Sequence, residues 1–249
     1  MRPYAVIIFD LFDTLVLFDE GRIPQVQLGG NVWRSTIGWT YEAFRREEPQ
    51  VPWEDFMGNL LEVDKELRAI RDGGREVSSR ERFRRLLTRL GLGDMGGLLD
   101  KVVREHMKAL LACTWLPTGH RETLKSLARR FRLALLSNFD DSESVRRLLA
   151  RETLDGLFEA VCISEDIGWR KPDRRAFEEP LRALGLGAEW ALFVGDSYEV
   201  DILGAKGAGM DAAWMNWRRE ERPPGSARAD YEVSSLEELA GLLEGMGPR

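Results

Sequence analysis

Four short runs of consecutive apolar residues constrain the fold of this chain more than any other feature. They cover residues 5–9, 133–136, 160–163 and 191–194, and a weaker fifth run covers residues 212–215. None of these runs shows the alternation of apolar and polar residues that is typical of a strand with one solvated face. Uninterrupted runs of this length are typical of strands that are buried on both faces of a parallel sheet.

Segments with helical periodicity lie between the later runs. In one of them Phe177, Leu181 and Leu184 fall on one helical face, and Gly185 is placed to end the helix. In another segment we expect Ser142 to cap the helix N-terminus. Strands that alternate with helices form right-handed crossover units. The pattern therefore predicts an α/β fold with a Rossmann-like, doubly wound parallel sheet.

The stretch between the first two apolar runs is too long to be a structureless loop in a compact domain. It has helical periodicity of its own, because apolar residues recur at i, i+3, i+4 and i+7 within residues 83–90. We therefore predict that residues 17–115 form an inserted, mostly α-helical domain. The core domain would then be discontinuous and would comprise residues 1–16 and 116–249.

The composition excludes several classes of protein. No apolar run approaches the roughly 20 residues of a membrane-spanning helix, and Asp10 stops the first run too early for a signal peptide. We therefore expect a cytoplasmic protein that does not bind membranes. The net charge of −6 argues against nucleic-acid binding. Two cysteines and two histidines argue against a disulfide scaffold and against a metal site built from these residues.

Polar side chains follow the apolar runs at the points where the predicted strands end. They are Asp10 after the first run, Ser137 and Asn138 after the second, Lys171 in the segment after the third, and Asp196 and Asp201 after the fourth. The carboxyl ends of parallel strands lie at one edge of a sheet, so we expect these side chains to be neighbours. Carboxylates, together with water and phosphate oxygens, are the ligands that Mg²⁺ prefers.

These segments resemble the conserved motifs of the haloacid dehalogenase superfamily of hydrolases and phosphotransferases. Residues 10–14 fit the pattern D-x-x-x-T, residues 171–173 read K-P-D, and residues 195–201 fit G-D-S-x-x-x-D. Ser137-Asn138 matches the Ser-Asn form of the second motif, and the four segments follow one another in the superfamily's order. The resemblance extends over the whole chain, and it includes the position of the inserted domain, which in the superfamily is a helical cap.

The resemblance implies a nucleophile and a metal site. Asp10 would take the phosphoryl group as an aspartyl phosphate, which divides one difficult displacement into two easier ones. A magnesium ion would be held by Asp10, the main-chain carbonyl of Phe12 and Asp196, with Asp201 as a further ligand or close neighbour. The ion would offset the repulsion between the carboxylate and an anionic phosphate.

The resemblance also implies which residues bind the substrate. Lys171 would be catalytic, because together with Ser137 it would hold phosphate oxygens where negative charge develops. Thr14 and Asn138 would orient the nucleophile and the substrate. The implied partner is a small phosphorylated metabolite, and a homodimer is compatible with the sequence.

Phe12 departs from the pattern of the superfamily's phosphatases. Those enzymes carry a second aspartate two residues after the nucleophile, which protonates the leaving group and later activates water. A positioned general acid or base contributes roughly 10²–10⁴ in rate. The neighbouring Asp13 is one residue too late to replace it directly, so we expect Asp13 to form turn hydrogen bonds instead.

Phe12 leaves three interpretations open. Haloalkanoate dehalogenases of the superfamily carry an aromatic residue here, so a metal-independent 2-haloacid dehalogenase is one alternative. Those dehalogenases lack the aspartate that this chain keeps as Asp196, and for that reason we favour a magnesium-dependent phosphatase. The third interpretation is a pseudoenzyme that binds a phosphorylated ligand or a protein partner without turnover, with Phe12 marking the lost step.

Overall fold

A six-stranded parallel sheet forms the centre of the computed structural model, which describes residues 4–93 and 97–245. The strand order is β10-β9-β8-β1-β6-β7, and every neighbouring pair is parallel. The strands are β1 (Val6–Phe9), β6 (Arg132–Ser137), β7 (Ala160–Ile163), β8 (Ala191–Gly195), β9 (Asp211–Met215) and β10 (Tyr231–Val233). The first strand lies inside the sheet and the order reverses around it, which confirms the predicted doubly wound α/β fold.

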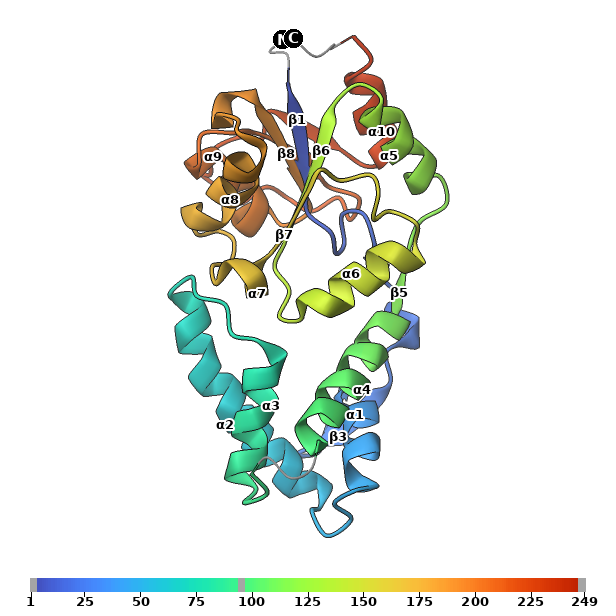
Figure 1. Cartoon of the computed structure of the whole chain (residues 1–249), viewed down its shortest axis with the longest axis vertical. Helices are drawn as coiled ribbons and strands as arrows, with labels where there is room; N and C mark the ends of the chain where they lie inside the picture. The colour runs from blue at the N-terminus through green and yellow to red at the C-terminus, as the bar shows by residue number, and fades with distance from the viewer. Residues whose placement is uncertain (1–3, 94–96, 246–249) are drawn as a thin grey trace.

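Helices cover both faces of the sheet (Figure 1). On one face lie α5 (His120–Ala128), α6 (Ser142–Arg151) and α10 (Leu236–Leu242). On the other face lie α8 (Arg174–Leu184) and α9 (Leu203–Gly207). The short α7 (Ser164–Ile167) follows β7 directly. Single helical turns cover Glu20–Arg22, Ala188–Trp190 and Tyr198–Ile202.

The two hydrophobic clusters explain why the strands read as uninterrupted apolar runs. Ile7 and Phe9 of β1 pack into the cluster beneath α5, α6 and α10. Val6 and Ile8 alternate with them and pack into the cluster beneath α8 and α9. Because successive side chains of a strand point to opposite faces, a strand that is covered on both sides needs apolar residues at every position.

Two local features test the helix predictions. Gly185 ends α8 in the left-handed conformation, with φ 67°, as predicted. The predicted N-cap of α6 is wrong by one residue. Asp141, not Ser142, adopts the extended cap conformation, and its side chain accepts a hydrogen bond from the Ser144 N–H. Ser142 instead donates its N–H and its hydroxyl to the Glu165 carboxylate, which lies on α7.

Among the described residues, four α-helices and two short strands lie between β2 and β5 in the chain and gather at one end of the molecule (Figure 1). They are α1 (Ile37–Arg45), α2 (Trp53–Asp72), α3 (Ser79–Arg89), α4 (Leu98–Ala112), β3 (Gln25–Leu28) and β4 (Asn31–Arg34). These helices share a separate hydrophobic cluster that includes Phe44, Phe56 and Phe83. The chain leaves and re-enters through an antiparallel pair, β2 (Leu17–Phe18) and β5 (Thr114–Trp115). The exact domain boundaries, with residues 17–115 as the insert, stay a prediction.

No helix in the described part of the chain is both long enough and apolar enough to cross a membrane.

Candidate active site

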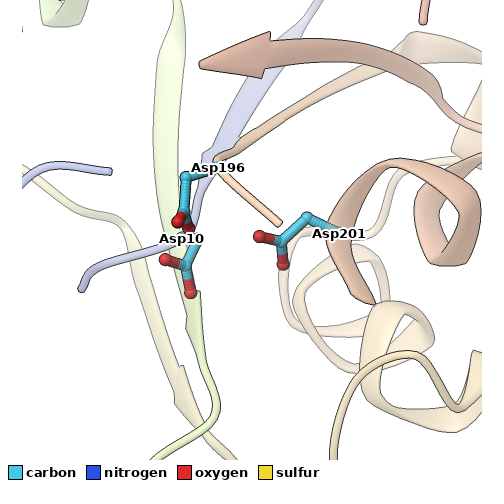
Figure 2. Close-up of side chains that lie close together, drawn as sticks. All are labelled: Asp10, Asp196 and Asp201. Carbon is cyan, nitrogen blue, oxygen red and sulfur yellow. The ribbon is translucent and has the colours of Figure 1, made fainter. Parts of the chain in front are cut away.

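Three aspartates meet at the carboxyl edge of the sheet (Figure 2). Asp10 follows β1, Asp196 follows β8, and Asp201 lies in the helical turn that comes next. One carboxylate oxygen from each residue lies within 4.8 Å of those of the other two. The structure therefore brings together Asp10 and Asp201, which are 191 positions apart in the sequence, at the edge where we expect the strands to end.

Lys171 is the buried cation of this cluster. Its side chain is only 2% exposed, and its Nζ lies 2.6 Å from Oδ1 of Asp10 and 2.7 Å from Oδ1 of Asp201. Burial by itself would lower the pKa of Lys171, but the two carboxylates outweigh it and the pKa is raised. The lysine therefore remains charged in the buried site and can attract an anionic substrate.

Burial also raises the pKa values of two of the carboxylates. It raises the pKa of Asp10 to about 6, although the adjacent Lys171 opposes the shift. It raises the pKa of Asp196 to about 7, and the nearby charges of Asp10, Asp201 and Asp13 act in the same direction. A bound cation favours the ionised form of a carboxylate, so the same burial and crowding that raise these pKa values suit a metal site.

Thr14 and Ser137 lie at the same edge. The Thr14 hydroxyl is buried and donates a long hydrogen bond of 3.4 Å to Oδ1 of Asp196. Ser137 ends β6, and its buried hydroxyl has no hydrogen-bond partner among the described residues. A buried hydroxyl without a partner costs free energy unless a ligand or water completes it. Ser137 thus offers a free donor at the carboxyl edge of the sheet.

Asn138 uses its side chain differently. Its Nδ2 donates to the carbonyl oxygen of Lys171 at 2.9 Å, and its Oδ1 accepts from the Lys171 N–H at 2.8 Å. The amide group therefore fixes the backbone of Lys171. Its predicted role in orienting the substrate stays a prediction.

Phe12 lies in an aromatic stack just beyond the carboxyl end of β1. Its ring centroid is 4.7 Å from that of Phe139 and 5.3 Å from that of Phe18. The adjacent Asp13 has φ 60°, and its Oδ1 accepts from the Phe18 N–H. The predicted turn role of Asp13 is thereby confirmed. Position 12, where the superfamily's phosphatases carry an acid, is thus an aromatic ring that packs against two others.

Arg218 is a residue that the sequence analysis missed. Its guanidinium lies 3.2 Å from Oδ2 of Asp196 and 3.2 Å from Oδ2 of Asp13, and it stacks on the ring of Trp217. Trp217 in turn donates its indole N–H to the carbonyl of Asp13. The segment that follows β9 could have been found with the rule applied to the other strands, because it too begins at a strand end.

The residues present suit a divalent cation. The ion pairs join four carboxylates (Asp10, Asp13, Asp196 and Asp201) to two cations (Lys171 and Arg218). This network carries an excess of two formal negative charges, which one Mg²⁺ would neutralise. The donors are hard oxygen atoms, as Mg²⁺ requires.

Comparison with known proteins shows that this chain is related to hydrolases. A family model described as "Haloacid dehalogenase-like hydrolase" matches residues 74–215. The chain is 29% identical to the glyceraldehyde 3-phosphate phosphatase of Pyrococcus furiosus, over 98% of this chain and 95% of that protein. It is 36% identical to the pyrimidine 5'-nucleotidase YjjG of Escherichia coli, but that match covers only 53% of this chain and 57% of the nucleotidase.

Solved structures include both metal-bound and dehalogenase relatives. The putative HAD-hydrolase YfnB from Bacillus subtilis bound to magnesium is 26% identical, with a TM-score of 0.63, over 98% of this chain and all of that one. The 2-haloacid dehalogenase from Pseudomonas syringae is 25% identical, with a TM-score of 0.74, over 96% of this chain and 98% of that one.

Proposed function

The chain belongs to the haloacid dehalogenase-like hydrolase family, and from this membership and the geometry of its site we propose that it is a magnesium-dependent phosphatase. Its substrate would be a small phosphorylated metabolite. One observation carries the proposal: Asp196 stands beside Asp10 and Asp201 at the edge of the sheet. A carboxylate at that position is useful when a cation binds there, and in a metal-free site it would repel an anionic substrate.

Asp10, the main-chain carbonyl of Phe12 and Asp196 would hold the magnesium ion, with Asp201 beside them. When bound, the ion supplies positive charge that lets a carboxylate approach an anionic phosphate. The magnesium-bound relative from Bacillus subtilis supports this assignment.

In the proposed reaction an oxygen of Asp10 attacks phosphorus, and the bond between phosphorus and the ester oxygen breaks. The leaving alkoxide takes a proton from a solvent water molecule, and Asp10 carries the phosphoryl group as an acyl phosphate. Water then attacks phosphorus and returns a proton to the solvent, the bond to Asp10 breaks so that its carboxylate is restored, and inorganic phosphate leaves. Lys171 and the free hydroxyl of Ser137 would stabilise the phosphate oxygens throughout.

A second function is favoured by a specific observation, the aromatic stack around Phe12. Release of halide from a 2-haloacid needs no proton, so a dehalogenase can do without an acid at this position. The full-length likeness to the Pseudomonas syringae dehalogenase supports this alternative.

A substrate panel distinguishes the two functions. The full chain would be assayed against phosphorylated metabolites and aryl phosphates with Mg²⁺ and with EDTA, and against 2-chloropropionate with halide detection. We expect phosphate release that EDTA abolishes. Halide release that persists in EDTA would establish the dehalogenase instead. If neither product forms but a phosphate mimic binds, the chain is a pseudoenzyme.

A further inference from the structure

The segment that links α2 to α3, residues 73–78, is bonded to the core next to Lys171. The carbonyl of Gly74 accepts from the Arg170 N–H at 3.0 Å, and the Glu76 N–H donates to the carbonyl of Gly168 at 3.1 Å. Arg75 also stacks on the ring of Trp169. This segment therefore lies against residues 168–170, which immediately precede the lysine of the site.

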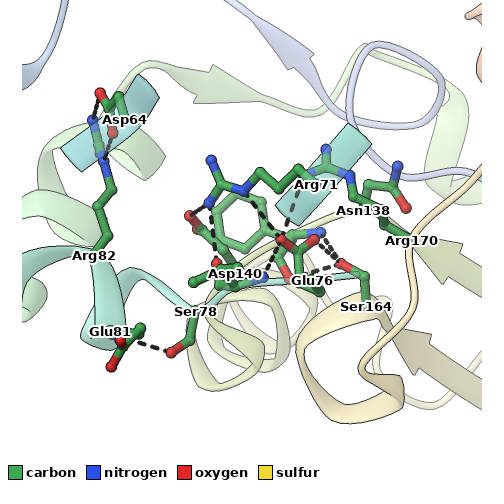
Figure 3. A network of polar contacts seen from close by, with 12 residues as sticks. Asp64, Arg71, Glu76, Ser78, Glu81, Arg82, Asn138, Asp140, Ser164 and Arg170 are labelled. Carbon is green, nitrogen blue, oxygen red and sulfur yellow. Dashed lines mark hydrogen bonds and ion pairs between the residues drawn. The ribbon is translucent and has the colours of Figure 1, made fainter. Parts of the chain in front are cut away.

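Glu76 is the buried centre of this contact (Figure 3). Its side chain is only 2% exposed. Oε2 accepts from the hydroxyl of Ser164 at 2.5 Å, and Oε1 lies 3.4 Å from Arg170 and 3.5 Å from Arg71. Arg71 also pairs with Asp140, so the carboxylate belongs to a network that joins α2 to two loops of the core.

The Ser164 hydroxyl carries the connection toward the site. It accepts the Phe139 N–H at 2.9 Å, which ties the start of α7 to the loop after β6. The residue before Phe139 is Asn138, whose amide brackets the backbone of Lys171. Glu76 is thus linked to both partners of the Asn138–Lys171 pair. Ser164 connects it to Phe139, which follows Asn138 in the chain, and Arg170, which precedes Lys171, is its ion-pair partner.

We propose that Glu76 is a positioning residue for Lys171. By holding the loop after β6 and residues 164–170 together, it keeps the Lys171 ammonium between the carboxylates of Asp10 and Asp201. A charge that must meet developing negative charge loses about 10²-fold in rate when it is misplaced by about 1 Å. The catalytic part of this inference rests on the proposed phosphatase function, whereas the structural part does not.

Three variants of the full chain test the proposal. Glu76→Gln keeps the shape but removes the charge that holds Arg71 and Arg170, and Ser164→Ala removes the hydroxyl link. Glu66→Gln is the matched control. Like Glu76, Glu66 pairs with two arginines, which in its case lie on α3, but its side chain is 45% exposed. Two readouts are compared: amide hydrogen exchange of Lys171 and Phe139 by NMR, and kcat and KM for p-nitrophenyl phosphate with Mg²⁺.

We expect the Lys171 and Phe139 amides to exchange at least about tenfold faster in Glu76→Gln and Ser164→Ala, while amides of β1 exchange as in the wild type. We expect kcat to fall about 10²-fold in Glu76→Gln, with a smaller change in KM. The control should match the wild type in both readouts.

Unchanged exchange at Lys171 in both test variants would overturn the proposal. If Glu76→Gln does not fold, Ser164→Ala alone decides by the same measurement. A wild type without phosphatase activity would refute the proposed function, yet the exchange data would still decide whether Glu76 holds the Lys171 backbone.

Discussion

The Nζ atom of Lys171 lies 2.6 Å from Oδ1 of Asp10, and both side chains are buried. A second carboxylate, that of Asp201, lies 2.7 Å from the same nitrogen. Removing one partner of a buried ion pair leaves an uncompensated charge, which costs about 3–5 kcal/mol. Lys171 therefore contributes to the stability of the fold as well as to the proposed chemistry.

The first prediction concerns this ion pair. Lys171→Met should lower the free energy of unfolding by about 3–5 kcal/mol, because two buried carboxylates lose their cation. Urea unfolding followed by circular dichroism measures the change. Lys101→Met is the control, since Lys101 pairs with Glu47 at the surface and should change stability by less than about 0.5 kcal/mol. Equal losses in the two variants would contradict the prediction.

The second prediction concerns metal binding. Asp196→Asn should weaken Mg²⁺ binding by at least about 10²-fold, because it removes an anionic oxygen ligand from the cluster. Isothermal titration calorimetry without substrate measures the affinity. Asp230→Asn is the control, because Asp230 pairs with Lys206 away from the three-aspartate cluster. Equal Mg²⁺ affinity in the Asp196 variant and the wild type would remove the main support for the phosphatase.

The third prediction concerns Phe12. Phe12→Asp should raise the turnover of alkyl phosphates by about 10²-fold or more, because a poor leaving group needs the proton that the wild type does not supply at this position. Aryl phosphates should gain far less. The substitution also loses two aromatic stacks, each worth about 0.5–1.5 kcal/mol. Phe12→Asn loses the same stacks without offering a proton, and identical kinetics in the two variants would contradict an acid role.

The sequence predicted the core of the site because strand burial leaves a clear pattern. Five of the six strands are apolar at nearly every position, and a polar residue marks where a strand ends. Once the strands are parallel, Asp10, Lys171 and Asp196 must approach the same edge. The strand β10 was missed because it is short and lies at the edge of the sheet, where Glu232 is exposed.

Other parts of the site depend on contacts that leave no periodic pattern. Arg218 looks like any other surface arginine until the segment after β9 docks against Asp13. Glu76 stands in a segment rich in charged residues and reads as solvated, yet it is buried because α2 and α3 place their link on the core. Tertiary docking decides where both side chains lie. The strand-end rule can point to the segment after β9, but local sequence rules reach neither the contacts of Arg218 nor the burial of the Glu76 side chain.

The last prediction concerns His106, which is buried in α4 among the helices of the insert. Its Nδ1 lies 3.0 Å from the Thr40 hydroxyl, and its ring meets the ring of Phe83 edge-on. Burial, reinforced by the positive charge of Arg82, lowers the pKa of His106 from 6.5 to about 3. The folded protein therefore keeps this ring neutral at a pH where the unfolded chain protonates it.

Because the unfolded state binds the extra proton, the contribution of His106 to the free energy of unfolding falls as pH drops below 6.5 and continues to fall until about pH 3. Between pH 6 and pH 4 this one group should cost about 2.5 kcal/mol. His106→Asn can still bond Thr40 but does not titrate, so its stability should change less over that range. Urea unfolding of both proteins at several pH values gives the difference, in which the titration of the shared carboxylates cancels. Parallel curves for the variant and the wild type would show that His106 is protonated in the folded state or is not buried.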